Sequence, residues 1–506
     1  MYSFLGGLVI LIVGYIMWGG FMEYVFGPDD RKTPAIAKED GVDFVPITPV
    51  RAFLIQLLNI AGLGPIFGAL SGAIWGPQVY LWIVFGTILA GAVHDYMVGM
   101  LSMRNDGASV SELTVKYLGA GVGNIMRVFS VVLLVMVGVV FMVGPAALLS
   151  KMITGSPELL SKLPENLKAL SGAEWTKYLT IAILVYYFAA TLFPVDKIIG
   201  KIYPLFGLCL IFMASGIGGV TVMNHVNGTK PMIELWEGMY NMHPKAASMP
   251  IWPLMFITVA CGAISGFHAT QSPIMARCLT SERQGRFVFY GAMVAEGAIA
   301  LIWASAGIAF YNTGAAGTFN TEALAAVGGG NANSVYEISV GLLGSIGAML
   351  ALLGVVACPI TSGDTAFRSA RLTLADWFGI DQKPFGPRLM LALPLLAAGY
   401  AISFLEYGVV WRYFSWSNQT LAMIALWAGA VYLCRNVAPA SGVIAAVPAT
   451  FMSAVSVTYF CIAPECYVML PTTQAYPIGI GVAALFLLIY LVRVYAPAAK
   501  GAGAQN

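Results

Sequence analysis

The sequence predicts an all-α, polytopic membrane protein with an inverted repeat of five plus five transmembrane helices, and two observations carry that prediction. Hydrophobic residues make up 59% of the chain and charged residues 10%, with a mean hydropathy of +0.80, whereas soluble domains average about 45–50% apolar and about 25% charged residues. Two of the most apolar stretches are interrupted by glycines, at 60–65 and 260–266. Irregular backbone survives at membrane depth only where it is buried in protein or lines a cavity. A pair of such interruptions in corresponding halves indicates a transporter binding site.

Apolar stretches of roughly 20 residues mark the expected spans. We expect thirteen, at 2–22, 52–74, 79–103, 125–149, 178–194, 199–223, 250–273, 286–311, 338–362, 389–405, 411–434, 442–463 and 475–495. Most of the 26 Lys and Arg residues then fall in one alternate set of loops and the C-terminal tail. Because basic loops stay in the cytoplasm, the sequence predicts a multi-pass membrane protein with the N-terminus outside and the C-terminus cytoplasmic.

One predicted outer loop and the low net charge bear on possible partners. The 312–337 loop is rich in Gly and Asn, contains no Lys or Arg, and is predicted outside as either a flexible lid or plain surface. The formal net charge is only +2 and no dense basic stripe occurs. Nucleic-acid binding depends on such a stripe, so no nucleic-acid partner is expected.

Ten spans remain when the first helix and the last two are set aside. We expect four regions: 1–50, an extra N-terminal helix and cytoplasmic loop; 51–224, the first five-helix repeat; 225–434, the inverted second repeat; and 435–506, two C-terminal helices and the tail. Five is an odd number, so the two repeats must cross the membrane in opposite directions. Gly62 and Gly262 then occupy equivalent places.

Each interruption offers a helix start inside the membrane. Proline is favoured at the first position of a helix, so a half-helix should start near Pro65, directly after Gly64. Ser265 is expected to cap a second half-helix that starts near Gly266. Helix N-termini bind anions well, whereas the alternative is that the glycines are packing notches between helices.

The predicted substrate-binding residues surround these two helix starts. They are Gly62, Gly64, Pro65, Gly262, Ser265, His268, Gln271 and Asn418. His268 directly follows the second interruption and would line the cavity or be an ordinary core histidine. Asn418 belongs to a polar run, 415–419, that would bond across helices or line the pathway.

Ionisable side chains inside spans are costly and usually face a cavity or a partner. Glu296 is the carboxylate predicted deepest in the membrane. It is a candidate proton carrier, or else a buried group that is paired for structural reasons. Asp95 is a second candidate, although Arg104 nearby favours a structural ion pair.

A third candidate for ion coupling is the cluster of Thr361, Ser362 and Asp364, which is expected to end a long apolar helix. Hydroxyl and carbonyl oxygens suit a hard cation such as Na⁺. Equally, Asp364 can pair with Arg368 four residues later. The coupling ion, H⁺ or Na⁺, stays open at this point.

Seven cysteines show neither a CxxC motif nor a Cys/His cluster with metal-ligand spacing. No metal site and no cofactor are therefore expected. Cys461 and Cys466 flank a short loop that is predicted outside, and they are either a disulfide or two free thiols.

Four segments closely resemble the carbon starvation protein A family: the run from GPIFGALSGAIWGPQVYLWIVF to MLSMRNDGASVSEL, ACGAISGFH, TSGDTAFRSARL and WRYFSWSNQTLA. The resemblance extends from about Gly41 to Ala430. It implies a plasma-membrane protein of the amino acid, polyamine and organocation transporter superfamily, with a LeuT-like five-plus-five fold and a role in uptake of peptides or pyruvate under carbon starvation.

This chain departs from the family pattern beside both interruptions. A His-His pair is frequent in the family where Ile55 and Gln56 stand here, and a Ser-Ser-Gly-Thr-Thr-type run often follows GFH where this chain has ATQSPIMARC. Longer members also continue beyond the thirteenth span. Substrate and coupling ion are therefore not transferred from the family.

These observations predict a secondary active transporter that imports a small carboxylate-bearing nutrient, pyruvate or peptides and amino acids, across the plasma membrane. The alternative is a transporter-like nutrient sensor without net transport. Motifs such as HExxH and paired catalytic aspartates do not occur in recognisable form, so no enzyme activity is expected. The expected partners are the carboxylate or peptide substrate and the lipid bilayer, and the oligomeric state stays open.

Overall fold

The protein is all-helical throughout the part that its structure, a computed structural model, describes. That part comprises residues 1–41, 44–192, 196–259, 261–313, 319–382 and 384–503. Ala260 of the second interruption and residues 314–318 of the predicted outer loop lie outside it. The first half of the chain forms α1 (Tyr2–Phe26), α2 (Pro34–Ala37), α3 (Pro49–Ile60), α4 (Ala69–Gly72), α5 (Val79–Leu81), α6 (Ala92–Arg104), α7 (Val110–Leu118), α8 (Ala120–Thr154), α9 (Pro157–Ser161), α10 (Glu165–Lys168), α11 (Gly172–Leu192) and α12 (Asp196–Val226).

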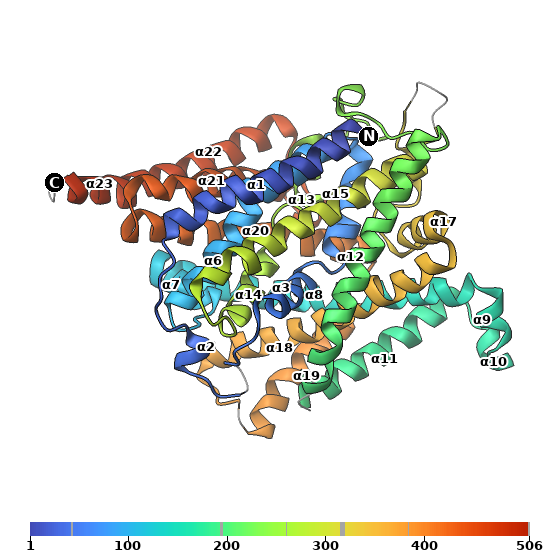
Figure 1. Ribbon diagram of the computed structural model, residues 1–506, viewed down its shortest axis with the longest axis horizontal. Helices are drawn as coiled ribbons and strands as arrows, with labels where there is room; N and C mark the ends of the chain where they lie inside the picture. Colours follow the sequence, from blue (N-terminus) through green and yellow to red (C-terminus); the bar gives the residue numbers. More distant parts are fainter. Residues whose placement is uncertain (42–43, 193–195, 260, 314–318, 383, 504–506) are drawn as a thin grey trace.

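The second half continues in the same style (Figure 1). It forms α13 (Ile251–Thr258), α14 (Gly266–Ala276), α15 (Gly291–Tyr311), α16 (Glu322–Ala326), α17 (Ala332–Ala351), α18 (Cys358–Phe378), α19 (Phe385–Ile402), α20 (Tyr407–Asn436), α21 (Val443–Ile462), α22 (Thr472–Tyr490) and α23 (Ala496–Gly503). Short π-helical turns join several of these into longer rods, at Trp82–Gly91, Arg286–Tyr290, Leu352–Ala357 and Leu491–Tyr495.

Nine helices within the described ranges are long and apolar enough to cross a membrane, or ten if the bent pair Pro49–Ile60 and Gly64–Trp75 is one crossing. The chain is therefore a multi-pass membrane protein. Helices lie over all thirteen predicted ranges. Three of these ranges are not among the helices counted: that of α11, that of α20, which contains the polar run 415–419, and that of the two short helices α13 and α14. The number of thirteen stays a prediction.

The first interruption is a bend between two helices. Helix α3 ends at Ile60, and a π-helical turn, Gly64–Gly68, begins the next helical piece with Pro65 in its first turn. The two pieces differ in direction by 53°. Proline lacks the N–H that would be unpaired at a helix start, so the predicted half-helix near Pro65 is confirmed.

The second interruption separates α13 from α14. Helix α13 ends at Thr258 and α14 begins at Gly266, so the described residues between them leave backbone groups without helical partners. The predicted start near Gly266 is confirmed. The two breaks thus occur in both halves of the chain, as the glycine pattern predicted.

The region predicted as one span, 338–362, differs from expectation. Helix α17 contains Gly344 with φ +60° and ψ −142°, a conformation that glycine adopts without steric cost. The chain then runs through Leu352–Ala357 into α18, which continues to Phe378. The prediction that Thr361, Ser362 and Asp364 end a helix is wrong, because these residues lie in the first two turns of α18.

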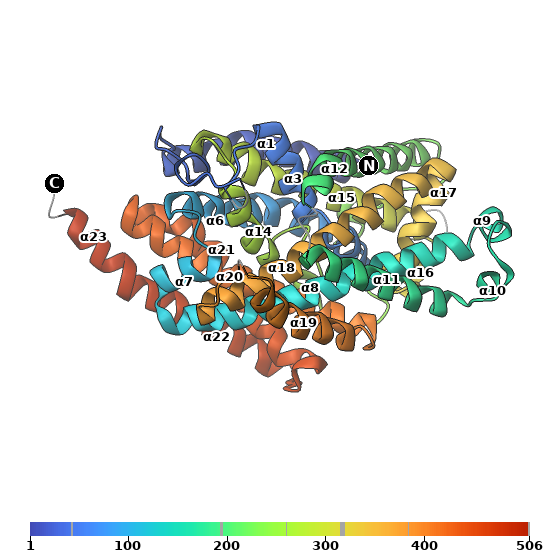
Figure 2. The same ribbon diagram turned by 90° about the horizontal axis from the view of Figure 1, so that it is seen from below.

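The two chain termini lie at different ends of the bundle. In Figures 1 and 2 the N-terminus lies toward the end that carries α9 and α10, and the C-terminus lies at the opposite end, beyond α7. Glu234 ties the start of α1 to the segment after α12, because its carboxylate accepts the N–H groups of Tyr2 and Ser3 at 2.8 Å each and pairs with the Met1 amino group. Burial alone would raise the pKa of Glu234, but the Met1 amino group and Ser3 have the larger opposite effect and lower this pKa to about 2.

Cys461 and Cys466 are free thiols in the structure, so of the two predicted alternatives the disulfide is not formed.

Candidate functional site

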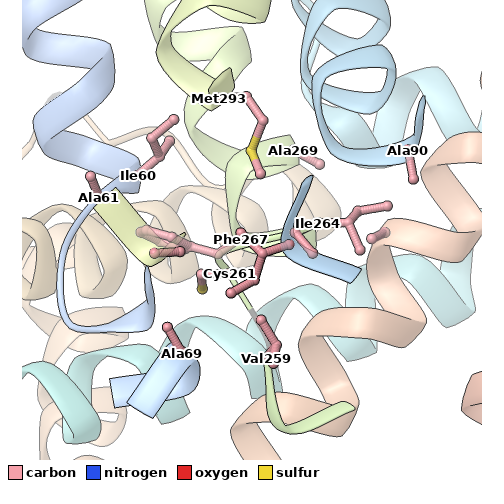
Figure 3. Packing of buried hydrophobic residues seen from close by; sticks show 14 of the residues in the cluster. Ile60, Ala61, Ala69, Ala90, Val259, Cys261, Ile264, Phe267, Ala269 and Met293 are labelled. Atoms are coloured by element: carbon pink, nitrogen blue, oxygen red, sulfur yellow. The ribbon is translucent and has the colours of Figure 1, made fainter. Parts of the chain in front are cut away.

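The two interruptions meet in the interior of the bundle. In Figure 3, Cys261 and Phe267 around the second break lie between Ile60 and Ala61 of the first break on one side and Ile264 on the other. A Cβ added to Gly262 would lie 2.5 Å from the Ala300 Cβ and 3.7 Å from the Pro65 Cα. The Thr87 hydroxyl donates to the Gly262 carbonyl at 3.1 Å, which satisfies one backbone group that the break frees. The glycines therefore act here as sites of close backbone approach between the breaks.

Helix α14 is capped from another helix. Ser265 occupies the cap position, but its side chain does not bond to the helix start. Instead the Asn418 Oδ1 on α20 accepts the Phe267 N–H at 2.7 Å and the Ser265 hydroxyl at 3.1 Å. The prediction that Ser265 caps this helix is wrong, because its hydroxyl is used as a donor toward α20. The neighbouring Gln419 donates to the Ile264 carbonyl at 3.1 Å, so the polar run bonds across helices as one alternative predicted.

Four ionisable side chains from three helices form a continuous buried array just after the second break. The His268 Nδ1 on α14 lies 2.9 Å from the Asp95 Oδ2 on α6, and its Nε2 lies 3.3 Å from the Glu296 Oε2 on α15. The His94 Nδ1 lies 2.7 Å from the other Asp95 oxygen. All four residues have no solvent exposure. We call His94, Asp95, His268 and Glu296 the buried array.

The geometry of the array requires at least one shared proton. If the His268 Nδ1–H donates to Asp95, the lone pair of Nε2 faces a Glu296 oxygen, and two acceptors repel one another. Within the described part of the chain, both Glu296 oxygens and the His268 Nε2 have no hydrogen-bond partner that meets normal geometry. A proton on either His268 Nε2 or Glu296 removes the repulsion. The four side chains thus hold ionisable atoms within 2.7–3.3 Å of one another without solvent exposure.

Asp95 does not pair with Arg104. The Arg104 guanidinium instead bonds both oxygens of Glu282 at 2.9 Å. Nine residues of helix separate Asp95 from Arg104, or about 13 Å at 1.5 Å per residue, which places them at different depths. The structural-pair prediction for Asp95 is wrong.

The Cys261 thiol lies next to the buried array. Donor atoms of Cys261, His268 and Glu296 all lie within 4.8 Å of one another, and thiolate, imidazole and carboxylate are donors that Zn²⁺ uses. These three residues could hold a metal ion. The spacing rules for Cys and His motifs could not find the group, because Glu296 comes from a separate helix.

The hydroxyl cluster on α18 lies at the first break rather than at the array. Ser362 and the Cys358 thiol both donate to the Leu58 carbonyl, each at 3.3 Å, near the end of α3. Thr361 donates to the Cys358 carbonyl within its own helix. Asp364 lies 3.8 Å from Arg368, which confirms that predicted pair. These groups therefore link α18 to the broken end of α3.

Gln271 lies one turn beyond His268 on α14. It is fully buried, and its amide nitrogen donates to the Thr270 hydroxyl at 3.0 Å. Its Oε1 has no hydrogen-bond partner among the described residues. An unsatisfied buried acceptor costs free energy, which is typical of positions that bind a further group.

Two hollows approach the breaks from opposite ends of the bundle. The larger, about 530 Å³, is lined by Phe67, Val143, Gly144, Ala147, Ser150, Lys151, Thr154, Gly172, Thr176, Asn331, Ala332, Asn333 and Tyr407. The smaller, about 180 Å³, is lined by Ser109, Val110, Ser111, Ser130, Thr270, Pro273, Ile274, Arg277, Ser369, Leu372, Thr373 and Asp376. Along α8 they are separated by the thirteen residues from Ser130 to Val143, about 20 Å. The first break thus lines the larger hollow through Phe67, and α14 lines the smaller one through Thr270 and Pro273.

Aromatic rings close the larger hollow toward the first break. The Phe67 ring centroid lies 5.9 Å from that of Trp411 and 6.4 Å from that of Tyr407. The predicted outer loop also reaches this place, because the Gly330 N–H donates to the Ser71 hydroxyl at 2.9 Å. Its described part, 319–337, is therefore packed against the first break, which neither predicted alternative anticipated.

Two residues of the site escaped the sequence analysis as candidates. His94 directly precedes Asp95, and Cys261 lies inside the second interruption. Their positions next to predicted residues were the available signal. Their partners, however, come from other helices and could not be paired from sequence.

Comparison with known proteins assigns the chain to a family. The model of the family "Carbon starvation protein CstA" matches residues 1–159 and 147–338. A protein of Haemophilus influenzae described as an uncharacterized membrane protein is 44% identical over 333 residues, which are 60% of this chain and 90% of that protein. Peptide transporter CstA of Bacillus subtilis is 29% identical in an alignment of 512 positions, which covers 85% of this chain and 85% of that protein. Pyruvate/proton symporter BtsT of Escherichia coli is 28% identical over 330 residues, 54% of this chain and 43% of that protein. The chain therefore belongs to the carbon starvation protein CstA family.

Proposed function

We propose that this protein is a secondary active transporter that imports a small carboxylate-bearing nutrient together with protons. The observation that carries the proposal is the buried array, in which His268 lies on α14 just after the second break and within 3.3 Å of both Asp95 and Glu296. The similar proteins named as a peptide transporter and a pyruvate/proton symporter support the same class of activity. Pyruvate, amino acids and short peptides are the substrates that we propose.

The substrate carboxylate would bind between the two breaks. The helix pieces that begin at Gly64 and Gly266 turn their N-termini, and so the positive ends of their dipoles, toward the interior. Lys151 is the one charged residue among those that line the larger hollow, and its ammonium would attract an anion toward Phe67. Backbone N–H groups at helix starts bind carboxylates without a counter-charge.

Coupling would follow from alternating access. The arrangement that we propose has residues 51–224 and 225–434 as inverted repeats that rock against each other, with the larger hollow open to the outside and the smaller one to the cytoplasm. Glu296 and His268 would take up a proton when substrate binds from outside. They would release it when the cytoplasmic side opens, so substrate and proton move together.

Sodium coupling is the competing possibility. Ser362 and the Leu58 carbonyl meet at the end of α3, and oxygen ligands of this kind suit Na⁺. We place proton coupling first, because Glu296 is a fully buried carboxylate whose oxygens have no hydrogen-bond partner among the described residues, and a proton would neutralise it.

The test uses purified protein in proteoliposomes with labelled pyruvate, lactate, an amino acid and a dipeptide. Glu296→Gln should abolish accumulation driven by a pH gradient but retain exchange of internal for external substrate, because the amide mimics a permanently protonated carboxyl. Retained exchange also shows that the variant is folded. Ser362→Ala is the matched control and should keep proton-driven accumulation. Equal accumulation by wild type and Glu296→Gln would refute proton coupling through this residue, and failure of all four substrates to enter would refute the transport proposal itself.

A further inference from the structure

A second pair of hollows lies away from the transport site, where α20 meets the C-terminal helices. The first, about 480 Å³, is lined by Cys434, Arg435, Val437, Ala438, Pro439, Arg493, Val494, Pro497, Ala498 and Gly501. No carboxylate is among these residues. Both arginines are exposed, and neither forms an ion pair within the described ranges. Two uncompensated guanidinium groups therefore share one concave surface.

An apolar crevice of about 440 Å³ continues from this hollow. It is lined by Leu118, Val122, Ile125, Phe129, Thr420, Met423, Ile424, Trp427, Val431, Phe486, Ile489, Tyr490 and Val494. Val494 lines both spaces, so they adjoin. The polar atoms of Trp427 and Thr420 are turned to other residues, because the Trp427 Nε1 donates to Ser453 at 3.0 Å and the Thr420 hydroxyl donates to the Trp416 carbonyl at 2.9 Å. The crevice thus offers an almost purely apolar wall.

The length of the crevice matches one leaflet of a bilayer. From Thr420 to Val431 helix α20 rises about 16 Å at 1.5 Å per residue, and half of a hydrocarbon core is about 15 Å. Arg435 follows one turn later, so an acyl chain that fills the crevice would bring its phosphate to this residue. Arg435 and Arg493 both belong to the basic set that the charge distribution assigns to the cytoplasmic side.

We propose that these two hollows form a binding site for an anionic phospholipid of the cytoplasmic leaflet. One acyl chain fills the crevice between α8, α20 and α22, and the phosphate headgroup lies between Arg435 and Arg493. Guanidinium groups form paired, charge-assisted hydrogen bonds with phosphate oxygens, and basic pockets between helices on the cytoplasmic side recognise such headgroups. The bound lipid would fix α22 and α23 against α20.

The test measures lipid retained by the purified full-length protein and its thermal stability. The protein is delipidated and then supplied with phosphatidylglycerol or phosphatidylcholine in mixed micelles. Phosphatidylglycerol should be retained and should raise the Tm, and the double variant Arg435→Gln/Arg493→Gln should bind it about thirtyfold more weakly. That factor follows from about 1 kcal/mol per basic residue at the surface and 1.4 kcal/mol per tenfold in affinity.

Control variants separate the two parts of the site. Lys32→Gln/Lys38→Gln removes the same charge from the same predicted side and should leave lipid binding unchanged. Ile424→Trp, which fills the crevice but keeps both arginines, should also lose the lipid. Inorganic phosphate alone should not raise the Tm, because it lacks the acyl chain. Equal retention of phosphatidylglycerol by wild type and the arginine double variant, or equal retention of the two lipids by wild type, would overturn the proposal.

Discussion

The contact between Gly262 and Ala300 offers the sharpest test of how closely the second break must approach its neighbours. A Cβ at position 262 would lie 2.5 Å from the Ala300 Cβ on α15. Carbon atoms pack at about 3.5–4.0 Å, so Gly262→Ala must displace the break or α15 by about 1 Å. The other two nearest atoms are 3.7 Å away, in ordinary contact. The substitution therefore introduces one defined clash.

Overpacking of this kind typically costs about 1–3 kcal/mol. Gly262→Ala should accordingly lower the Tm and reduce the initial rate of substrate uptake about fivefold or more, since each 1.4 kcal/mol corresponds to a factor of about ten. Ala300→Gly removes the opposing methyl group. Although the single variant Ala300→Gly should itself lose about 1 kcal/mol of helix stability, the double variant Gly262→Ala/Ala300→Gly should recover most of the uptake.

The assay is a double-mutant cycle of Tm and proteoliposome uptake, in which neighbouring residues show interaction free energies of about 0.5–3 kcal/mol. Gly121→Ala serves as the control, because a Cβ there meets no atom within 4 Å. Wild-type stability and uptake in Gly262→Ala would refute the close approach. Additive losses in the double variant would show that the clash with Ala300 is not the cause.

Four further predictions follow from the same structure. Lys151→Gln should raise the KM for an anionic substrate with little change in kcat, and Lys151→Arg should preserve the KM. A cysteine in place of Glu322 should react with an impermeant thiol reagent from outside the cell, whereas Gly386→Cys should react only after permeabilisation. Asn418→Ala removes the cap of α14 and should cost about 1 kcal/mol of stability, while Asn418→Asp retains an acceptor and should cost less. The pKa of Glu234 is lowered from 4.5 to about 2 in the folded protein, so its contribution to stability is full above about pH 4.5 and is lost as the pH falls toward about 2. The Tm difference between wild type and Glu234→Gln should shrink over that same range.

For each of these four predictions, one result would contradict the reasoning. An unchanged KM in Lys151→Gln would separate the larger hollow from substrate entry. The reverse labelling pattern for the two cysteines would invert the orientation that the charge distribution predicts. Equal Tm values for Asn418→Ala and wild type would contradict capping from α20. A Tm difference for Glu234→Gln that is independent of pH would show that its carboxylate charge is not what anchors α1.

Local sequence was sufficient for the breaks. Proline within the first turn after Gly64 and glycine at 266 set helix starts through the geometry of their own backbone. The same holds for the Asp364–Arg368 pair, because residues four apart on a helix always share a face. Such features depend on a few neighbouring residues and are readable in any context.

The sequence predicted the ends of helices less well where helical turns are irregular. Hydropathy placed a helix end near 362, yet α18 continues to Phe378. Its continuation carries Arg371 as a buried side chain, which a hydropathy pattern assigns to a loop. Burial of a charged residue depends on the neighbours that surround it, and these belong to other parts of the chain.

What the sequence determined by itself was therefore the class of protein, a helical membrane protein with two broken helices, and the residue types near the breaks. Only the tertiary structure decided their partners. His268 meets Asp95 across 173 positions, and Phe267 meets Asn418 across 151. Which face a helix turns inward, and at what depth, is set by packing of the whole bundle. Hydrogen-bond geometry tolerates errors of only a few tenths of an ångström, so the partners of the buried array emerge only when every helix is in place.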